Sequence, residues 1–141
     1  MRRVLVAALL LPLLGGCGSD QDAYCDTVEA HQQDLTELIG SDRPDALHDA
    51  LDVFRQLQDH APDDIAGEWK VLVDDITAFG DAVRAAGVDP ATYDPKDPSI
   101  SAEDRKAIEA ASRRLASPET LEALRAVDQE VRDVCHTPLT M

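Results

Sequence analysis

The sequence predicts an all-α protein, an antiparallel bundle of four to five helices closed by one disulfide. Apolar residues recur at intervals of three and four along most of the chain, as in amphipathic helices. No stretch shows the alternation of apolar and polar residues that is typical of half-buried strands. Two cysteines, Cys25 and Cys135, stand near the two ends of the helical region. These observations together favour a bundle whose first and last helices meet.

The first two helices are expected over residues 22–39 and 43–60. Gly40 ends the first helix. Asp42 is the expected N-cap of the second, and Pro44 falls in its first turn, where the missing N–H costs nothing. Each helix has one apolar face. The positions on these faces are Tyr24, Val28, His31, Leu35, Leu38, Leu47, Leu51, Phe54 and Leu57.

The third helix, expected over residues 65–86, has the most regular pattern. Its apolar positions repeat at four and three, and Gly87 follows them. Gly67 and Gly80 lie inside the helix, at about 1 kcal/mol each relative to alanine. We expect these two glycines to allow a neighbouring helix to approach closely. The repeating positions are Ile65, Trp69, Leu72, Ile76, Phe79, Val83 and Ala86.

Residues 88–100 are expected to form a stiff loop without a helix, because they contain three Asp-Pro pairs. A fourth helix over 101–116 begins at Ser101 as its cap, and Ser117 caps a last helix that reaches Val134. The apolar positions of these two helices are Ile108, Ala111, Leu115, Leu121, Leu124, Val127, Val131 and Val134.

A bond between Cys25 and Cys135 requires the start of the first helix to meet the end of the last. The helix over 101–116 then either continues into the last helix as one bent arm or climbs along the bundle before the last helix descends. The 13-residue loop before it can extend roughly 40 Å, comparable to the third helix, so the sequence leaves both directions open.

The first residues of the chain have the form of a secretory signal. Arg2 and Arg3 precede an apolar run over residues 4–14. This run is too short to cross a bilayer, which needs about 20 apolar residues, but it suits an export signal. The segment Leu14-Gly15-Gly16-Cys17 that follows resembles the lipobox of bacterial lipoproteins. In composition the chain resembles the small exported lipoproteins of actinobacteria.

The resemblance implies that residues 1–16 are a lipoprotein signal peptide and that Cys17 carries the lipid. Its thiolate is the nucleophile that such a modification requires, and two or more acyl chains anchor a protein stably. Residues 17–21 would be a tether, and residues 22–141 a helical domain on the extracytoplasmic face of the cell membrane. The alternative is an ordinary cleaved signal peptide with an incidental cysteine.

Cys25 and Cys135 remain after lipid takes the first cysteine, and outside the cytoplasm such a pair favours a disulfide. A metal site and a reactive thiol are the other interpretations of the same residues. The sequence has no Cys-x-x-Cys pattern, and only His136 adjoins either cysteine.

The chain is strongly acidic, with 28 acidic and 13 basic residues and a net charge of −15. This charge argues against nucleic-acid binding, which needs Lys and Arg at the phosphates. It also argues against docking on anionic headgroups without a covalent anchor. A basic protein or another envelope component is the partner that the charge favours. The sequence does not indicate an oligomeric state.

Two features are candidates for cation binding. His31 interrupts the apolar face of the first helix and would be a metal ligand, a pH-sensitive group or a hydrogen-bonded residue at the core boundary. Asp89, Asp94 and Asp97 in the loop over 88–100 carry oxygen ligands that suit calcium, although their spacing differs from that of an EF-hand.

Two further histidines, His48 and His60, have aspartates near them in the sequence. The chain has no Glu-x-x-His motif of the kind that ferritin-like metal sites use, so solvated helix faces explain these pairs better than a metal site does. Trp69 would stack on a ligand if exposed, but its place on the apolar face of the third helix favours core packing. The neighbouring aspartates are Asp45, Asp52, Asp63 and Asp64.

The sequence contains no motif that specifies catalysis. A nucleophile elbow, a Gly-rich phosphate loop and a His-Glu-x-x-His pattern are all missing. We therefore expect a non-enzymatic lipoprotein without a cofactor, with a binding or scaffolding role at the cell envelope. The alternative expectation is an envelope lipoprotein that binds a divalent cation or a transition metal through His31 or the acidic loop.

Overall fold

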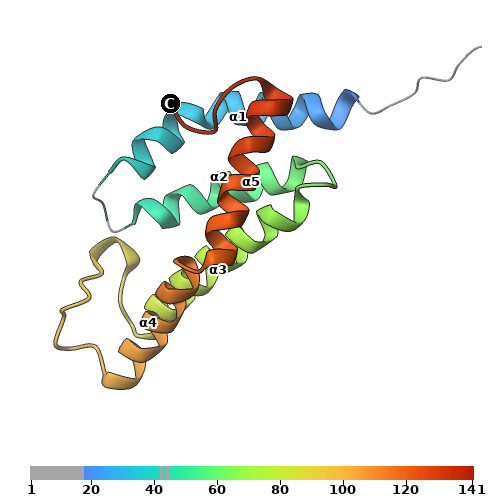
Figure 1. Ribbon diagram of the computed structural model, residues 1–141. Helices are drawn as coiled ribbons and strands as arrows, with labels where there is room; N and C mark the ends of the chain where they lie inside the picture. The colour runs from blue at the N-terminus through green and yellow to red at the C-terminus, as the bar shows by residue number, and fades with distance from the viewer. Residues whose placement is uncertain (1–17, 42, 44) are drawn as a thin grey trace, which may run out of the picture.

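The structure, a computed structural model, describes residues 18–41, 43 and 45–141 (Figure 1). This part of the chain is all-α, which confirms the predicted fold class. Its elements are α1 (Gly18–Ile39), α2 (Ala46–His60), α3 (Ala66–Ala85), the 3-10 helix η1 (Pro90–Thr92), α4 (Ala102–Leu115) and α5 (Pro118–Cys135). None of these helices is both long enough and apolar enough to cross a membrane.

The helices α1, α2 and α3 follow one another in antiparallel order, and α4 and α5 both run back along α3 (Figure 1). Ile108 of α4 packs with Val83 near the end of α3, whereas Thr120 of α5 bonds to Asp75 in its middle. The fourth and fifth helices therefore form one arm that bends at Ser117. This is the first of the two directions that the sequence left open.

The main core lies where α1, α2, α3 and α5 meet. Trp69 is fully buried at its centre, with the ring centroids of Phe54 and Tyr24 at 5.4 Å and 6.5 Å in edge-on geometry. A smaller core joins α3 to α4 through Val83, Ile108 and the loop residue Ile100. The end of α3 and α4 thus has its own apolar contacts, separate from the main core.

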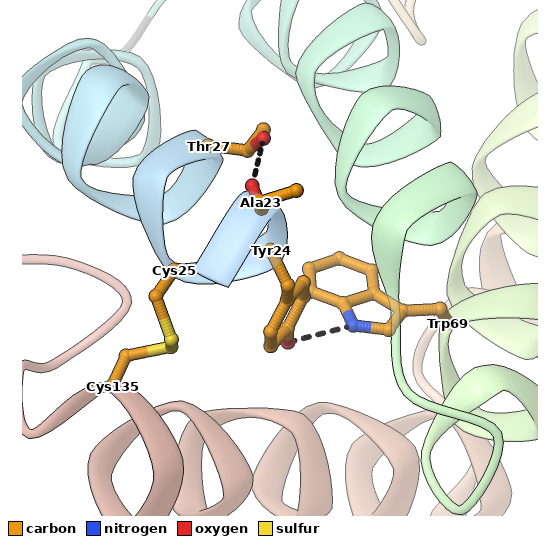
Figure 2. Close-up of a disulfide and its surroundings, with 6 residues drawn as sticks. All are labelled: Ala23, Tyr24, Cys25, Thr27, Trp69 and Cys135. Atoms are coloured by element: carbon orange, nitrogen blue, oxygen red, sulfur yellow. Dashed lines mark hydrogen bonds between the residues drawn. A yellow bond between two sulfur atoms is a disulfide. The ribbon is translucent and has the colours of Figure 1, made fainter. Parts of the chain in front are cut away.

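A disulfide joins the start of α1 to the end of α5 (Figure 2). The Cα atoms of Cys25 and Cys135 are 5.2 Å apart, so the predicted bond is present. The residues that follow α5 fold back on α1. Gln32 donates a side-chain hydrogen bond to Thr137 at 2.9 Å, and Leu139 of this segment is buried.

Several helix boundaries differ from those expected. The helix α1 begins at Gly18, so residues 18–21 of the expected tether are helical, with Asp20 in the first turn where a negative charge is favourable. The helix α2 begins at Ala46, after Asp45 rather than Asp42. The expected cap Asp42 and the expected first-turn residue Pro44 lie outside the described residues.

The loop and the glycines bring two corrections. The segment 88–100 is not free of helix, because η1 begins with Pro90 at its first position, where no N–H is needed. A neighbouring helix does not explain the two internal glycines. A Cβ atom at Gly67 would meet nothing within 4 Å, and one at Gly80 would meet only the side chain of Arg84. Gly87 does end α3, with a positive φ of 73°.

Candidate functional site: an apolar groove between α2 and α5

An apolar groove of about 480 Å³ opens between α2 and α5, with α3 as its floor. Its volume lies within the range of roughly 300–1,000 Å³ that is usual for ligand sites. Five large apolar side chains are exposed among the described residues, and four of them line this groove. These four are Ile39, Leu47, Leu121 and Leu124.

The groove follows from the way in which the helices pack. Both α2 and α5 contact α3, and the first half of α5 does not close over the first half of α2. Small side chains at Ala46 and Ala50 of α2 deepen the space between them. Leu72, Ile76 and Phe79 form the floor, and the remaining lining residues are Leu38, Ser41, Arg43, Phe54, Leu115 and Thr120.

A buried polar contact fixes the first turn of α5 against α3 at the edge of the groove. Asp75 is only 2% exposed, and its carboxylate accepts a hydrogen bond from the Thr120 hydroxyl at 2.6 Å. The guanidinium of Arg114, at the end of α4, lies 2.5 Å from the other carboxylate oxygen. Ser117 accepts the backbone N–H of Thr120 at 3.2 Å. This cluster holds the bend between α4 and α5.

Arg43 lies at the rim of the groove, where two carboxylates of the α2 region engage it. Its Nε donates to Asp45 at 2.9 Å, and its terminal amine forms a close contact with Asp49. The hydrogen bonds raise the pKa of the guanidinium and lower the pKa of the Asp45 carboxyl below its usual value. One cation between two anions gives this group of three side chains a net negative charge.

His31, the weak metal candidate, does not line the groove. Its side chain is 26% exposed, so it sits at the boundary of the core on α1. The Nδ1 atom lies 3.8 Å from Asp34, which is too far for a hydrogen bond, and it is one of two buried side-chain polar atoms in the described residues that lack one. Those residues contain no group of three or more His, Cys, Asp or Glu side chains that could hold a metal ion.

The histidine and aspartate pairs noted in the sequence do not form close contacts. The two aspartates expected beside His48 bind arginines instead. Asp45 accepts a hydrogen bond from Arg43, and Asp52 accepts one from Arg55. The Nδ1 of His48 instead lies 3.4 Å from Arg84. That arginine also lines a second, more polar hollow of about 610 Å³ beside η1. His60, Asp63 and Asp64 are all exposed.

The three loop aspartates each stabilise their own turn. Each carboxylate of Asp89, Asp94 and Asp97 accepts the backbone N–H two residues further on, at 2.8–2.9 Å. Hydrogen bonds from Ser99 lower the pKa of the Asp97 carboxyl. Arg105 ties the loop to α4 by donating to the backbone carbonyl of Asp97 at 2.9 Å. These carboxylates act as turn formers and do not converge on a common point.

Trp69 is a core residue, as its position in the repeat indicated. It is fully buried, and its indole N–H donates to the Tyr24 hydroxyl at 3.0 Å (Figure 2). Burial raises the pKa of the Tyr24 phenol to about 12, because the charged phenolate is disfavoured in the apolar surroundings. This pair lies next to the disulfide, and neither residue lines the groove. Cys17, the expected lipidation site, lies outside the described residues.

Sequence reasoning did not identify the groove or the Asp75 cluster. A partial signal existed for the cluster, since Asp75 is an acidic residue three positions after Leu72 and next to Ile76, on the apolar face of α3. The capping role of Ser117 was expected and is present. Comparison with protein-family models, with curated proteins and with solved structures finds no match to this chain.

Proposed function

We propose that the protein is a lipoprotein of the cell envelope, anchored through Cys17 on the extracytoplasmic face of the membrane, and that it acts by binding a partner rather than by catalysis. The lipobox-like segment over residues 14–17 supports the anchor. The disulfide between Cys25 and Cys135 suits an oxidising compartment.

The gathering of exposed apolar side chains in one groove carries the binding part of the proposal. Single exposed apolar residues are common on protein surfaces, but contiguous apolar patches mark interaction sites. Here four of the five exposed residues of this kind in the described part of the chain share one concave site. Non-covalent binding is the chemistry that such a lining supports best.

The geometry of α1 supports a site held away from the bilayer. The helix follows Cys17 directly and has 22 residues, so it extends about 33 Å. Ile39 at its far end lines the groove. A lipid at the start of α1 and a binding groove at its other end would present the groove to a partner in the envelope.

Replacing the anchor cysteine tests the location. We expect Cys17→Ser to abolish acyl labelling and to leave an uncleaved precursor, because serine supplies no thiolate. Normal acyl labelling of this variant, or recovery of the wild type with an unmodified mature terminus, would contradict the anchor. Cys25→Ser is the matched control, since it removes a cysteine and leaves the lipobox intact.

A photo-crosslinking amino acid tests the binding surface in the native envelope. Placed at Leu121 it should give discrete crosslinked species, whereas the same group at Met141, which is 73% exposed and outside the groove, should not. Equal crosslinking from the two positions would remove the groove as the binding surface.

A further inference from the structure

We infer that the groove between α2 and α5 receives an amphipathic helix from a partner protein, with an apolar face about two turns long and basic residues on its flanks. The inference rests on the proposed binding function and adds the kind of partner. Three observations carry it: the spacing of the lining residues, the volume of the groove and the charge around it.

The lining residues repeat at helical spacing on the two sides that a docked helix would meet. On α3 the floor residues Leu72, Ile76 and Phe79 are separated by four and three positions, and so span about 10 Å. On α2, Leu47 and Phe54 are also seven positions apart. A helix that anchors through positions i, i+4 and i+7 presents its apolar side chains over the same length.

The volume of the groove suits the anchors of such a helix. A cavity of about 150 Å³ holds one benzene molecule, and a benzene ring has the size of a phenylalanine ring. The groove, at about 480 Å³, therefore has room for about three large apolar side chains. Three is also the number of anchors that two helical turns supply.

The charge around the groove favours basic flanks on the partner. The last turns of α1, which reach the groove at Leu38 and Ile39, carry Asp34 and Glu37 and no Lys or Arg. At the rim of α2, Arg43 is engaged by Asp45 and by a second aspartate, which leaves that cluster negative. Complementary charge would speed association and discriminate against acidic partners.

A synthetic peptide provides the probe. We would use an acetylated, amidated 15-residue helix with Leu at positions i, i+4 and i+7 and with Lys and Ala elsewhere. The full-length protein would be held in phosphatidylcholine nanodiscs, whose neutral lipid does not attract the peptide, with empty nanodiscs as the blank. We expect saturable binding with one peptide per protein, measured by fluorescence anisotropy.

Two control peptides separate the components of recognition. A scrambled peptide of identical composition, whose leucines no longer share a face, should bind at least tenfold more weakly. A peptide with Glu in place of Lys should also bind at least tenfold more weakly than the basic peptide. Raising NaCl from 0.05 to 0.5 M should lower the affinity of the basic peptide several-fold, because salt screens exposed charges.

Matched protein variants locate the site. Leu47→Asp and Leu121→Asp should each weaken the basic peptide at least tenfold, since each puts a charge where an apolar anchor would lie. Met141→Asp adds the same charge at an exposed apolar residue outside the groove and should leave the affinity within twofold. Circular dichroism would verify that each variant keeps its helices.

Four results would overturn the inference: no binding of the basic peptide, equal binding of the scrambled peptide, unchanged affinity in both groove variants, or displacement of the peptide by a second copy of the protein or by a fatty acid that binds the groove more tightly. If the peptide fails while crosslinking from Leu121 persists, the helical partner is wrong and the proposed binding function stands. If the peptide does not bind and Leu121 gives no crosslinks, both the helical partner and the proposed binding function are wrong.

Discussion

The two ends of the bundle are closed to different degrees, although α2, α3 and α5 contribute to both. At the disulfide end, Tyr24, Trp69 and Val131 are fully buried. At the groove end, Leu121 and Leu124 of α5 remain 42% and 39% exposed. One end is packed and cross-linked, and the other presents apolar side chains to solvent.

The difference shows how one fold can separate stability from binding. The covalent bond and the largest buried side chains lie together around Trp69, so that end supplies most of the packing. At the other end a polar contact between Asp75 and Thr120 fixes α5 to α3 beside the groove. Apolar residues can therefore stay exposed there without loosening the bundle.

Removal of the disulfide should have the largest effect on stability. The bond joins residues 110 positions apart, and in the chain-entropy model such a loop contributes on the order of 4–5 kcal/mol. We expect the double variant Cys25→Ala, Cys135→Ala to lose about that much in urea unfolding. Wild-type protein treated with a reductant is the control and should behave alike. Two free thiols in the denatured, unreduced wild type would show that the bond does not form.

Truncation of the central tryptophan should have the next largest effect. Trp69→Ala removes a fully buried ring and leaves a cavity, which typically costs about 3–5 kcal/mol. Trp69→Phe keeps most of the packing and loses the hydrogen bond to Tyr24, so it should cost less. Denaturant unfolding of both variants measures the difference. An alanine variant as stable as the wild type would mean that the disulfide end is not the packed end.

Alkaline pH should lower the free energy of unfolding through Tyr24, at the disulfide end of the bundle. Burial in the folded protein raises the pKa of the Tyr24 phenol from its ordinary value of 10 to about 12. Its contribution is therefore complete below pH 10 and is lost as the pH rises towards 12, about 3 kcal/mol in all. Tyr24→Phe should remove this part of the pH dependence, as measured by urea unfolding at several pH values. Equal slopes in wild type and variant above pH 10 would contradict the burial of this phenol.

Substitution in the groove should have the smallest effect on stability. Leu121→Gln replaces a half-exposed side chain at the groove wall, so the free energy of unfolding should stay within about 0.5 kcal/mol of the wild type. Leu57→Gln on α2 is the matched control, because Leu57 is fully buried and its loss should be severe. A large loss from Leu121→Gln would show that this leucine serves the fold rather than a partner.

The helices could be predicted from the sequence because apolar spacing and capping residues are local features of the chain. Apolar spacing placed α3, and Ser101 and Ser117 marked the starts of α4 and α5. The direction of α4 was not predictable, because loop length permitted two paths. The groove was not predictable either. Leu47 and Phe54 lie seven positions apart on one face of α2, yet Phe54 is buried and Leu47 is 36% exposed.

The contacts that decide burial join residues that are far apart in the chain. The hydrogen bond from Trp69 to Tyr24 spans 45 positions, as does that from Thr120 to Asp75. Periodicity tells which residues face a neighbour but not which neighbour they face. The difference between the closed end and the open end is therefore a property of the packed helices and not of any one segment.

Methyl NMR of the nanodisc-held protein, titrated with the basic amphipathic peptide, tests the difference between the two ends most directly. We expect methyl signals of Leu47, Leu121 and Leu124 to shift and those of Leu57 and Val131 to stay in place. Shifts centred on Leu57 and Val131, or a spectrum that the peptide leaves unchanged, would contradict a binding surface at the open end.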